Sequence, residues 1–187
     1  MIREIRFAGS GGQGILLAGN VLAESAAIYE GLNVARNTAY GGQVRGGASR
    51  CEVLLADSDE EIDFPQVLCA DVLAAMSPEA VKEYAREVRD EGLILIDSTL
   101  VKEKPDVKAR VVGIPFTTIA DEELGKTHVA NMVMLGALLA LTNLVALESV
   151  EKALIDNVPS HTVEVNLKAF RRGVQIGKEN KIVTERG

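Results

Sequence analysis

The sequence predicts a single α/β domain over residues 1–187, with helices on both faces of a Rossmann-like, mostly parallel mixed sheet. Three observations support this three-layer α/β/α fold. The apolar run 2–8 leads through a glycine turn into a helical pattern. Residues 70–97 read strand, helix, strand, which is typical of a crossover between parallel strands. Hydrophobic residues make up 47% of the chain and aromatic residues only 4%. The core must therefore be aliphatic, which suits a buried sheet.

Each element is predicted from its hydrophobic periodicity and from the residues that mark its ends. Strands are predicted at 2–8, 32–39, 50–56, 70–76, 93–96 and 109–114. Helices are predicted at 13–30, from Ser77 to Gly92, briefly within 115–125, and at 129–146, 148–158 and 162–179. The strand at 50–56 is expected to add an antiparallel edge to the sheet. The polar tail, 179–187, is expected to be flexible.

Particular residues mark the ends of these helices. Ser77 followed by Pro78 and Glu79 is a strong helix start, because it combines an N-cap serine, a first-turn proline and an acid near the positive helix end. Gly31 and Gly92 are predicted to stop the helices that precede them.

The segment 129–147 carries no charge and is long enough to span a bilayer. It contains polar Asn131, Thr142 and Asn143, and it stands alone in an otherwise soluble pattern. We therefore predict a helix that is buried within the domain or at a subunit interface.

Composition excludes several classes of function. The net charge of −7 argues against a nucleic-acid surface and is compatible with a cytoplasmic protein. Cys51 and Cys69 are predicted to be buried free thiols. They are too few to hold an iron–sulfur cluster alone, and with only His128 and His161 as further ligands a structural zinc site is unsupported. The N-terminus does not resemble a signal peptide.

The stretch Gly9-Ser10-Gly11-Gly12-Gln13-Gly14 follows the first predicted strand and opens into the first helix. Its glycines at 9, 11 and 14 satisfy G-x-G-x-x-G. Such glycines let the backbone turn tightly and let a ligand approach the main chain. The first amides of the helix are then unpaired and suit a phosphate. The first hypothesis is a nucleotide-like ligand on the amides of 12–14.

Two alternatives to that hypothesis remain open. A nicotinamide dehydrogenase would carry an acidic residue about 20 residues further on, to bind a ribose hydroxyl. The second predicted strand, 32–39, contains Arg36 and no carboxylate. The glycines could also serve only to pack the first helix closely on the sheet.

A second glycine cluster surrounds Arg45-Gly46-Gly47. A guanidinium suits bidentate contact with an anion, and neighbouring glycines would let a ligand or another chain lie close. The alternative is a glycine-rich hairpin with a solvated arginine. No self-sufficient catalytic set is found: both histidines are isolated, and Ser10 lacks a strained G-x-S-x-G elbow. Asp97-Ser98 ends a strand where ligands bind, but a turn or capping role explains it equally well.

The two glycine motifs together, with Ala39-Tyr40-Gly41 and Ala48-Ser49, resemble the gamma subunit of 2-oxoacid:ferredoxin oxidoreductases. The same unit forms one domain of the fused pyruvate enzymes. The resemblance extends to the Asn166-Leu167-Lys168-Ala169-Phe170-Arg171-Arg172-Gly173 helix and so covers nearly the whole chain. It is greatest with the 2-oxoglutarate branch; pyruvate, branched-chain and aromatic (indolepyruvate) 2-oxoacid enzymes are the alternatives.

The resemblance implies a reaction and a division of labour. The family decarboxylates a 2-oxoacid oxidatively to an acyl-coenzyme A and passes electrons to ferredoxin. Thiamine diphosphate and iron–sulfur clusters would lie on partner alpha and beta subunits, and a ferredoxin-like delta subunit is a further candidate partner. This chain would contribute to assembly and to the coenzyme A site. The expected contacts are Gly9, Gly11, Gly12, Gln13, Gly14, Arg45, Gly46 and Gly47, with no catalytic residue, no metal and no membrane contact.

Overall fold

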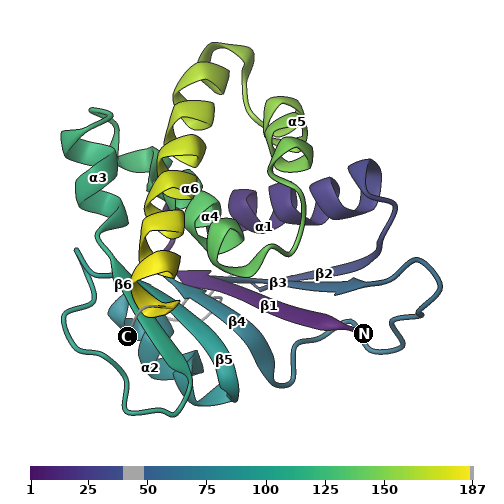
Figure 1. Cartoon of the computed structure of the whole chain (residues 1–187). Helices are drawn as coiled ribbons and strands as arrows, with labels where there is room; N and C mark the ends of the chain where they lie inside the picture. The colour runs from purple at the N-terminus through teal and green to yellow at the C-terminus, as the bar shows by residue number, and fades with distance from the viewer. Residues whose placement is uncertain (40–48, 186–187) are drawn as a thin grey trace.

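The computed structural model describes residues 1–39 and 49–185, with side chains described as far as Lys181. Within these residues, six strands form one sheet in the order β2-β3-β1-β4-β5-β6 (Figure 1). The strands are β1 (Arg3–Gly9), β2 (Asn33–Ala39), β3 (Ser49–Ala56), β4 (Ala70–Ala75), β5 (Val88–Asp97) and β6 (Arg110–Ile114). The helices are α1 (Ile15–Glu24), α2 (Pro78–Tyr84), α3 (Phe116–Glu122), α4 (Ala130–Thr142), α5 (Leu147–Asn157) and α6 (Val163–Glu185).

The sheet is mixed, as predicted. β1, β4, β5 and β6 are parallel neighbours in that order. β3 runs antiparallel to both β1 and β2, so it lies inside the sheet and β2 forms the edge. The expected antiparallel strand at 50–56 is present, but its expected position at the edge was wrong. The physical reason is burial: residues 51–56 are all buried, so side chains of both orientations need cover, which an interior strand receives.

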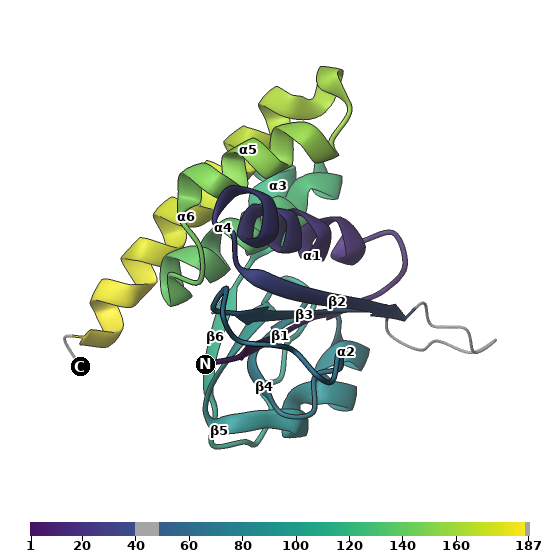
Figure 2. The ribbon, with the colours of Figure 1, turned by 90° about the vertical axis from the view of Figure 1, so that its right-hand side faces the viewer.

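The three predicted layers are present, but they are unequal. α1, α3, α4, α5 and α6 lie on one face of the sheet, and α2 lies on the other (Figure 2). Two clusters of buried apolar side chains correspond to these faces. Phe7 of β1 belongs to the larger cluster with α1 and α4, whereas its neighbour Ala8 belongs to the smaller cluster with α2. This alternation is what a strand between two layers requires.

α4 is the central helix of the larger layer. Every residue from Ala130 to Leu141 is buried, which confirms the predicted helix buried within the domain. Among residues 1–39 and 49–185, no helix is both long and apolar enough to cross a membrane. α4 packs on α6 almost backbone to backbone. The approach is so close that a Cβ at Gly173 would lie 2.0 Å from the Val133 carbonyl oxygen.

Several predicted boundaries differ from the structure. α1 begins at Ile15 rather than residue 13, and a π-helical turn, Ser25–Tyr29, continues it. α6 runs to Glu185, beyond the predicted end at 179. The expected flexibility of the tail stays a prediction.

The largest boundary error concerns α2, which ends at Tyr84 instead of extending to Gly92. Gly92 lies inside β5, where the β4–β5 register shifts between Ala70 and Val72. A Cβ at Gly92 would lie 2.9 Å from the Asp71 carbonyl oxygen, so this glycine serves a close approach of two strands and not a helix stop.

The two cysteines are both free, but they differ in burial. Cys51 on β3 is fully buried, as predicted. Cys69 is exposed, so its predicted burial was wrong. β4 begins only at Ala70, and Cys69 remains in the preceding loop, where its backbone N–H donates to Glu4 Oε2 at 3.1 Å.

Candidate functional site

The glycine turn lies at the point where the sheet changes its direction of winding. From β1 the chain passes through α1 to β2 on one side, and from β4 it passes through α2 to β5 on the other. β1 and β4 are adjacent and parallel, so their carboxyl ends meet. Open α/β sheets bind ligands in the crevice outside the carboxyl ends at such a switch point. The candidate site is therefore the Ser10–Gly14 turn together with Met76 and Ser77 after β4.

The turn depends on glycine for its shape. Gly12 has φ +86° and Gly14 has φ +71°, both in the left-handed region. Gly14 is the N-cap of α1 and brings no side-chain cap to the helix. The first helical amides are left without intrahelical partners, which suits an anion. A Cβ at Gly11 would meet nothing within 4 Å, so the rim of the turn is open.

Gln13 links the turn to the neighbouring strand. Its Oε1 accepts from the Ser10 backbone N–H at 2.7 Å, and its Nε2 donates to the Met76 carbonyl oxygen at 2.8 Å. The Gln13 backbone N–H donates to the Ser10 carbonyl at 3.3 Å and so closes the turn itself. The side chain therefore bridges the carboxyl ends of β1 and β4. Its predicted contact with a ligand stays a prediction.

Gly9 and Gly14 are required by their close neighbours. A Cβ at Gly9 would lie 2.5 Å from Gln13 Oε1, and one at Gly14 would lie 2.3 Å from Asn131 Nδ2. Asn131 donates from that nitrogen to the Gly14 carbonyl at 3.1 Å. Sequence reasoning did not assign Asn131 to the site. The available signal was a polar residue near the start of an otherwise apolar helix, now known to be 2% exposed.

The second glycine cluster lies outside the described residues, so Arg45, Gly46 and Gly47 stay predictions as contacts. The residues that flank it are described. Gly9 pairs with Ser49, and Ala39 pairs with Arg50. The chain therefore leaves the sheet after β2 and re-enters it at β3 beside the carboxyl end of β1, where the glycine turn begins.

Asp97 has a structural role. It is fully buried at the end of β5. One carboxylate oxygen accepts from the Thr99 N–H at 3.0 Å, and the other accepts from the Thr117 N–H at 3.3 Å and from the Thr117 hydroxyl at 2.5 Å. These bonds hold the turn after β5 and the start of α3, which agrees with the turn or capping role considered for Asp97 from the sequence. His128 and His161 are exposed. Within residues 1–39 and 49–185, no cluster of possible metal ligands occurs.

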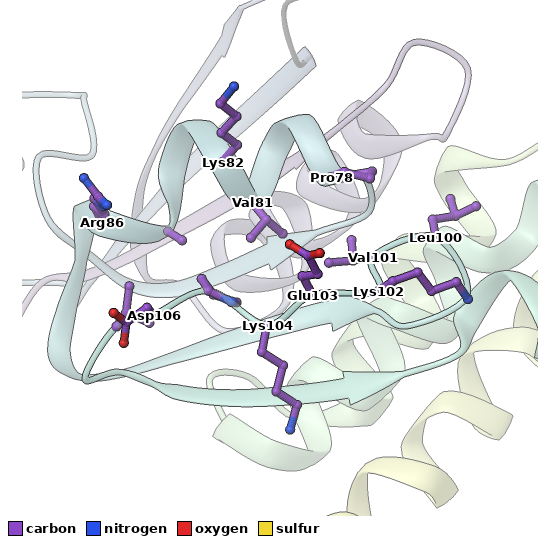
Figure 3. A pocket seen from close by; sticks show the side chains of 13 residues that line it. Pro78, Val81, Lys82, Arg86, Leu100, Val101, Lys102, Glu103, Lys104 and Asp106 are labelled. Carbon is purple, nitrogen blue, oxygen red and sulfur yellow. The ribbon is translucent and has the colours of Figure 1, made fainter.

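A cavity of about 730 Å³ lies away from the turn, between α2 and the loop that leads to β6. Val81, Ala85 and Val101 contribute apolar surface to it. Figure 3 shows Glu103 beside Val81 and Val101, while Lys82 and Lys104 point away from the space between α2 and the loop. Because its charged groups do not converge, we place the candidate site at the switch point instead.

Comparison with known families identifies the chain's relatives. A family model described as pyruvate ferredoxin/flavodoxin oxidoreductase matches residues 4–176. A 2-oxoglutarate synthase subunit KorC of Methanocaldococcus jannaschii is 46% identical over 181 residues, which cover 96% of each chain. The ketoisovalerate oxidoreductase subunit VorA of Methanothermobacter thermautotrophicus is 36% identical over 95% of this chain, but the match spans 37% of that longer protein.

Solved structures share the same fold. The gamma subunit of a keto/oxoacid ferredoxin oxidoreductase from Geobacter sulfurreducens is 39% identical, with a TM-score of 0.83 and coverage of 92% of this chain and 96% of that one. A 2-oxoglutarate:ferredoxin oxidoreductase from Magnetococcus marinus, solved with 2-oxoglutarate, coenzyme A and succinyl-CoA bound, also gives a TM-score of 0.83. It is 24% identical and covers 95% of this chain and 31% of that chain, so this likeness is one of fold.

Proposed function

Because the chain belongs to the pyruvate ferredoxin/flavodoxin oxidoreductase family, as a gamma subunit of 2-oxoglutarate:ferredoxin oxidoreductase, we propose that it binds coenzyme A at the glycine turn and contributes to assembly. The enzyme would release the product as an acyl-coenzyme A. The thiamine and iron–sulfur chemistry would take place on partner subunits.

The shape of the turn is the observation that carries the proposal. The rim at Gly11 is open, and the first amides of α1 follow a left-handed N-cap without a side-chain cap. Coenzyme A offers a pyrophosphate and a ribose 3′-phosphate, and phosphates bind well at such helix starts. The Magnetococcus enzyme, in which a region of a longer chain has the same fold, was solved with coenzyme A bound. Arg45 is the candidate for a second phosphate contact.

The rival proposal is a nicotinamide dehydrogenase that acts alone. Such an enzyme would use an acidic side chain on the second strand to hold the ribose. β2 reads Asn33-Val34-Ala35-Arg36-Asn37-Thr38-Ala39 and offers none. Titration of coenzyme A, NAD and NADP against the purified assembly separates the two proposals. Tight nicotinamide binding without coenzyme A binding would favour the rival.

The partners follow from the same proposal. Alpha and beta subunits would carry thiamine diphosphate and the clusters, a ferredoxin-like delta subunit is a further candidate, and ferredoxin would receive the electrons in the cytoplasm. The isolated chain is expected to show no 2-oxoacid oxidation, and activity should return when the partner subunits are added. Turnover by the isolated chain would contradict this division of labour.

Gly11 offers a sharp test of the phosphate contact. A side chain fits there without a clash, so Gly11→Asp places a negative charge at the turn and Gly11→Asn places a neutral side chain of the same shape. We expect Gly11→Asp to raise the KM for coenzyme A by roughly tenfold through charge repulsion, and Gly11→Asn to raise it much less. The KM for the 2-oxoacid should stay unchanged in both. Equal effects of the two variants would argue against a phosphate at the turn.

A further inference from the structure

The carbonyl of Gly14 is held by a residue that lies far away in the sequence. Asn131, in the first turn of α4, donates from Nδ2 to the Gly14 oxygen at 3.1 Å. Its other amide atom, Oδ1, accepts from the Met132 N–H at 3.0 Å. Both ends of the side-chain amide are thus engaged, and at 2% exposure solvent has little access to them. The orientation of this amide is therefore well defined.

Gly14 transmits that constraint to α1. Its carbonyl also accepts from the Ala18 N–H at 3.1 Å, which is the first helical hydrogen bond of α1. The Gly14 peptide is at once the N-cap of the helix and the end of the turn, with φ +71° and ψ +22°. A rotation of this peptide would redirect the amides that follow it. Asn131 opposes such a rotation from the side of α4, while Gln13 holds the turn from the side of β4.

We propose that Asn131 is a positioning residue that fixes the glycine turn for its anionic ligand and connects the turn to the α4–α6 helix pair. This inference rests on the proposed coenzyme A site for the identity of the ligand. The constraint on the turn itself does not depend on the ligand. Because α4 is packed closely on α6 through Gly173 and Gly136, the partner of the turn is a rigid helix rather than a loop.

Two substitutions in the assembled oxidoreductase test the role of Asn131. Asn131→Ala removes the side-chain amide. Asn131→Leu removes the hydrogen bond but fills similar space, so it keeps the buried volume occupied if the alanine variant does not assemble. Thr142→Ala is the matched control, because Thr142 also donates to a backbone carbonyl, that of Leu138 at 2.8 Å, but at the opposite end of α4.

The first measurement is amide hydrogen exchange of the segment 10–17 in the absence of ligand. We expect faster exchange in both Asn131 variants and no change in Thr142→Ala. The second measurement is steady-state kinetics. The KM for coenzyme A should rise roughly two- to tenfold, the range expected for one lost hydrogen bond, while the KM for the 2-oxoacid stays the same.

The outcomes separate this inference from the proposed function. Faster exchange with a raised KM for coenzyme A supports both. Faster exchange with an unchanged KM supports the positioning role and overturns the coenzyme A site. Unchanged exchange in the Asn131 variants that assemble overturns the positioning role, whatever the kinetics show.

Discussion

Cys51 and Cys69 illustrate how local surroundings decide the chemistry of a residue. Cys51 on β3 is fully buried, and its Sγ lies against α1, where a Cβ at Gly19 would approach it to 2.3 Å. Burial raises the pKa of the Cys51 thiol to about 11. The thiolate is the reactive form, so Cys51 should be inert in the folded chain near neutral pH. Cys69 is exposed.

This contrast predicts a simple thiol count. In the purified chain at pH 8, one thiol should react rapidly with a disulfide reagent such as DTNB, and two should react after unfolding in guanidinium. A thiol with a pKa of about 11 is ionised to about one part in a thousand at pH 8, and burial blocks access as well. Cys69→Ser should abolish the rapid reaction, whereas Cys51→Ser should leave it intact. Rapid reaction in Cys69→Ser would contradict the burial of Cys51.

Single residues also show what the sequence could predict at the site. The spacing of Gly9, Gly11 and Gly14 was sufficient to predict a turn between strand and helix. The roles of Gln13 and Asn131 were not predictable, because their partners lie 63 and 117 residues away. Such contacts exist only once the strands are ordered in the sheet, and no local pattern encodes them.

At the scale of elements, the contact between α4 and α6 explains the last motif of the sequence resemblance. Gly173 ends that motif, and its backbone approaches Val133 closely. The two arginines before it pair with neighbouring helices: Arg171 bonds Glu151 of α5 twice at 2.7 Å, and Arg172 bonds Glu123 just after α3 at 2.6 and 3.0 Å. The motif thus contributes to packing of the larger layer.

Gly173→Ala should therefore destabilise the chain. An added Cβ would lie 2.0 Å from the Val133 carbonyl oxygen, so the two helix backbones would have to separate. We expect the free energy of unfolding to fall by about 2 kcal/mol or more, as in overpacked cores. Lys168→Ala, on the exposed side of α6, should change it by less than about 0.5 kcal/mol. Urea unfolding curves measure both, and equal midpoints would show that the helices can separate without cost.

The boundary between α2 and β5 marks where element prediction failed. Val81, Tyr84, Ala85 and Val88 recur at helical spacing, and that pattern favours a helix up to Gly92. The structure instead pairs Val88 with Ala70 of β4. Pairing with β4 outweighs the local helical preference of these four residues, and no local pattern in the sequence predicts that pairing.

At the scale of the whole molecule, a buried arginine joins the sheet to the smaller layer, which contains α2. Arg6 of β1 is 3% exposed on the side of α2. Its Nε donates to Glu52 Oε1 at 3.0 Å, and an Nη atom donates to the Val67 carbonyl at 2.8 Å. It also pairs with Glu87, and its guanidinium carbon lies 4.7 Å from the Tyr84 ring centre. Arg6 thus links β1, β3, the loop before β4 and the end of α2.

Sequence analysis did not predict this cluster, because residues 2–8 were interpreted as one apolar strand although Arg6 lies within them. Arg6 and Glu52 are cross-strand partners in the β1–β3 register, which only the antiparallel pairing brings together. The antiparallel pairing of β3 with β1 is therefore what makes the buried ion pair possible.

A double-mutant cycle tests how much the pair contributes. Arg6→Met leaves the Glu52 carboxylate, itself 2% exposed, with Arg50 at 3.7 Å as its one remaining cationic partner among residues 1–39 and 49–181. Removal of one partner from a buried pair costs about 3–5 kcal/mol, and we expect a value near the lower end because Arg50 remains. Arg6→Met with Glu52→Leu removes the stranded charge, so the double variant should be more stable than Arg6→Met alone. Urea unfolding of the wild type, both single variants and the double variant gives the coupling energy. Additive losses would mean that the two side chains act independently of each other.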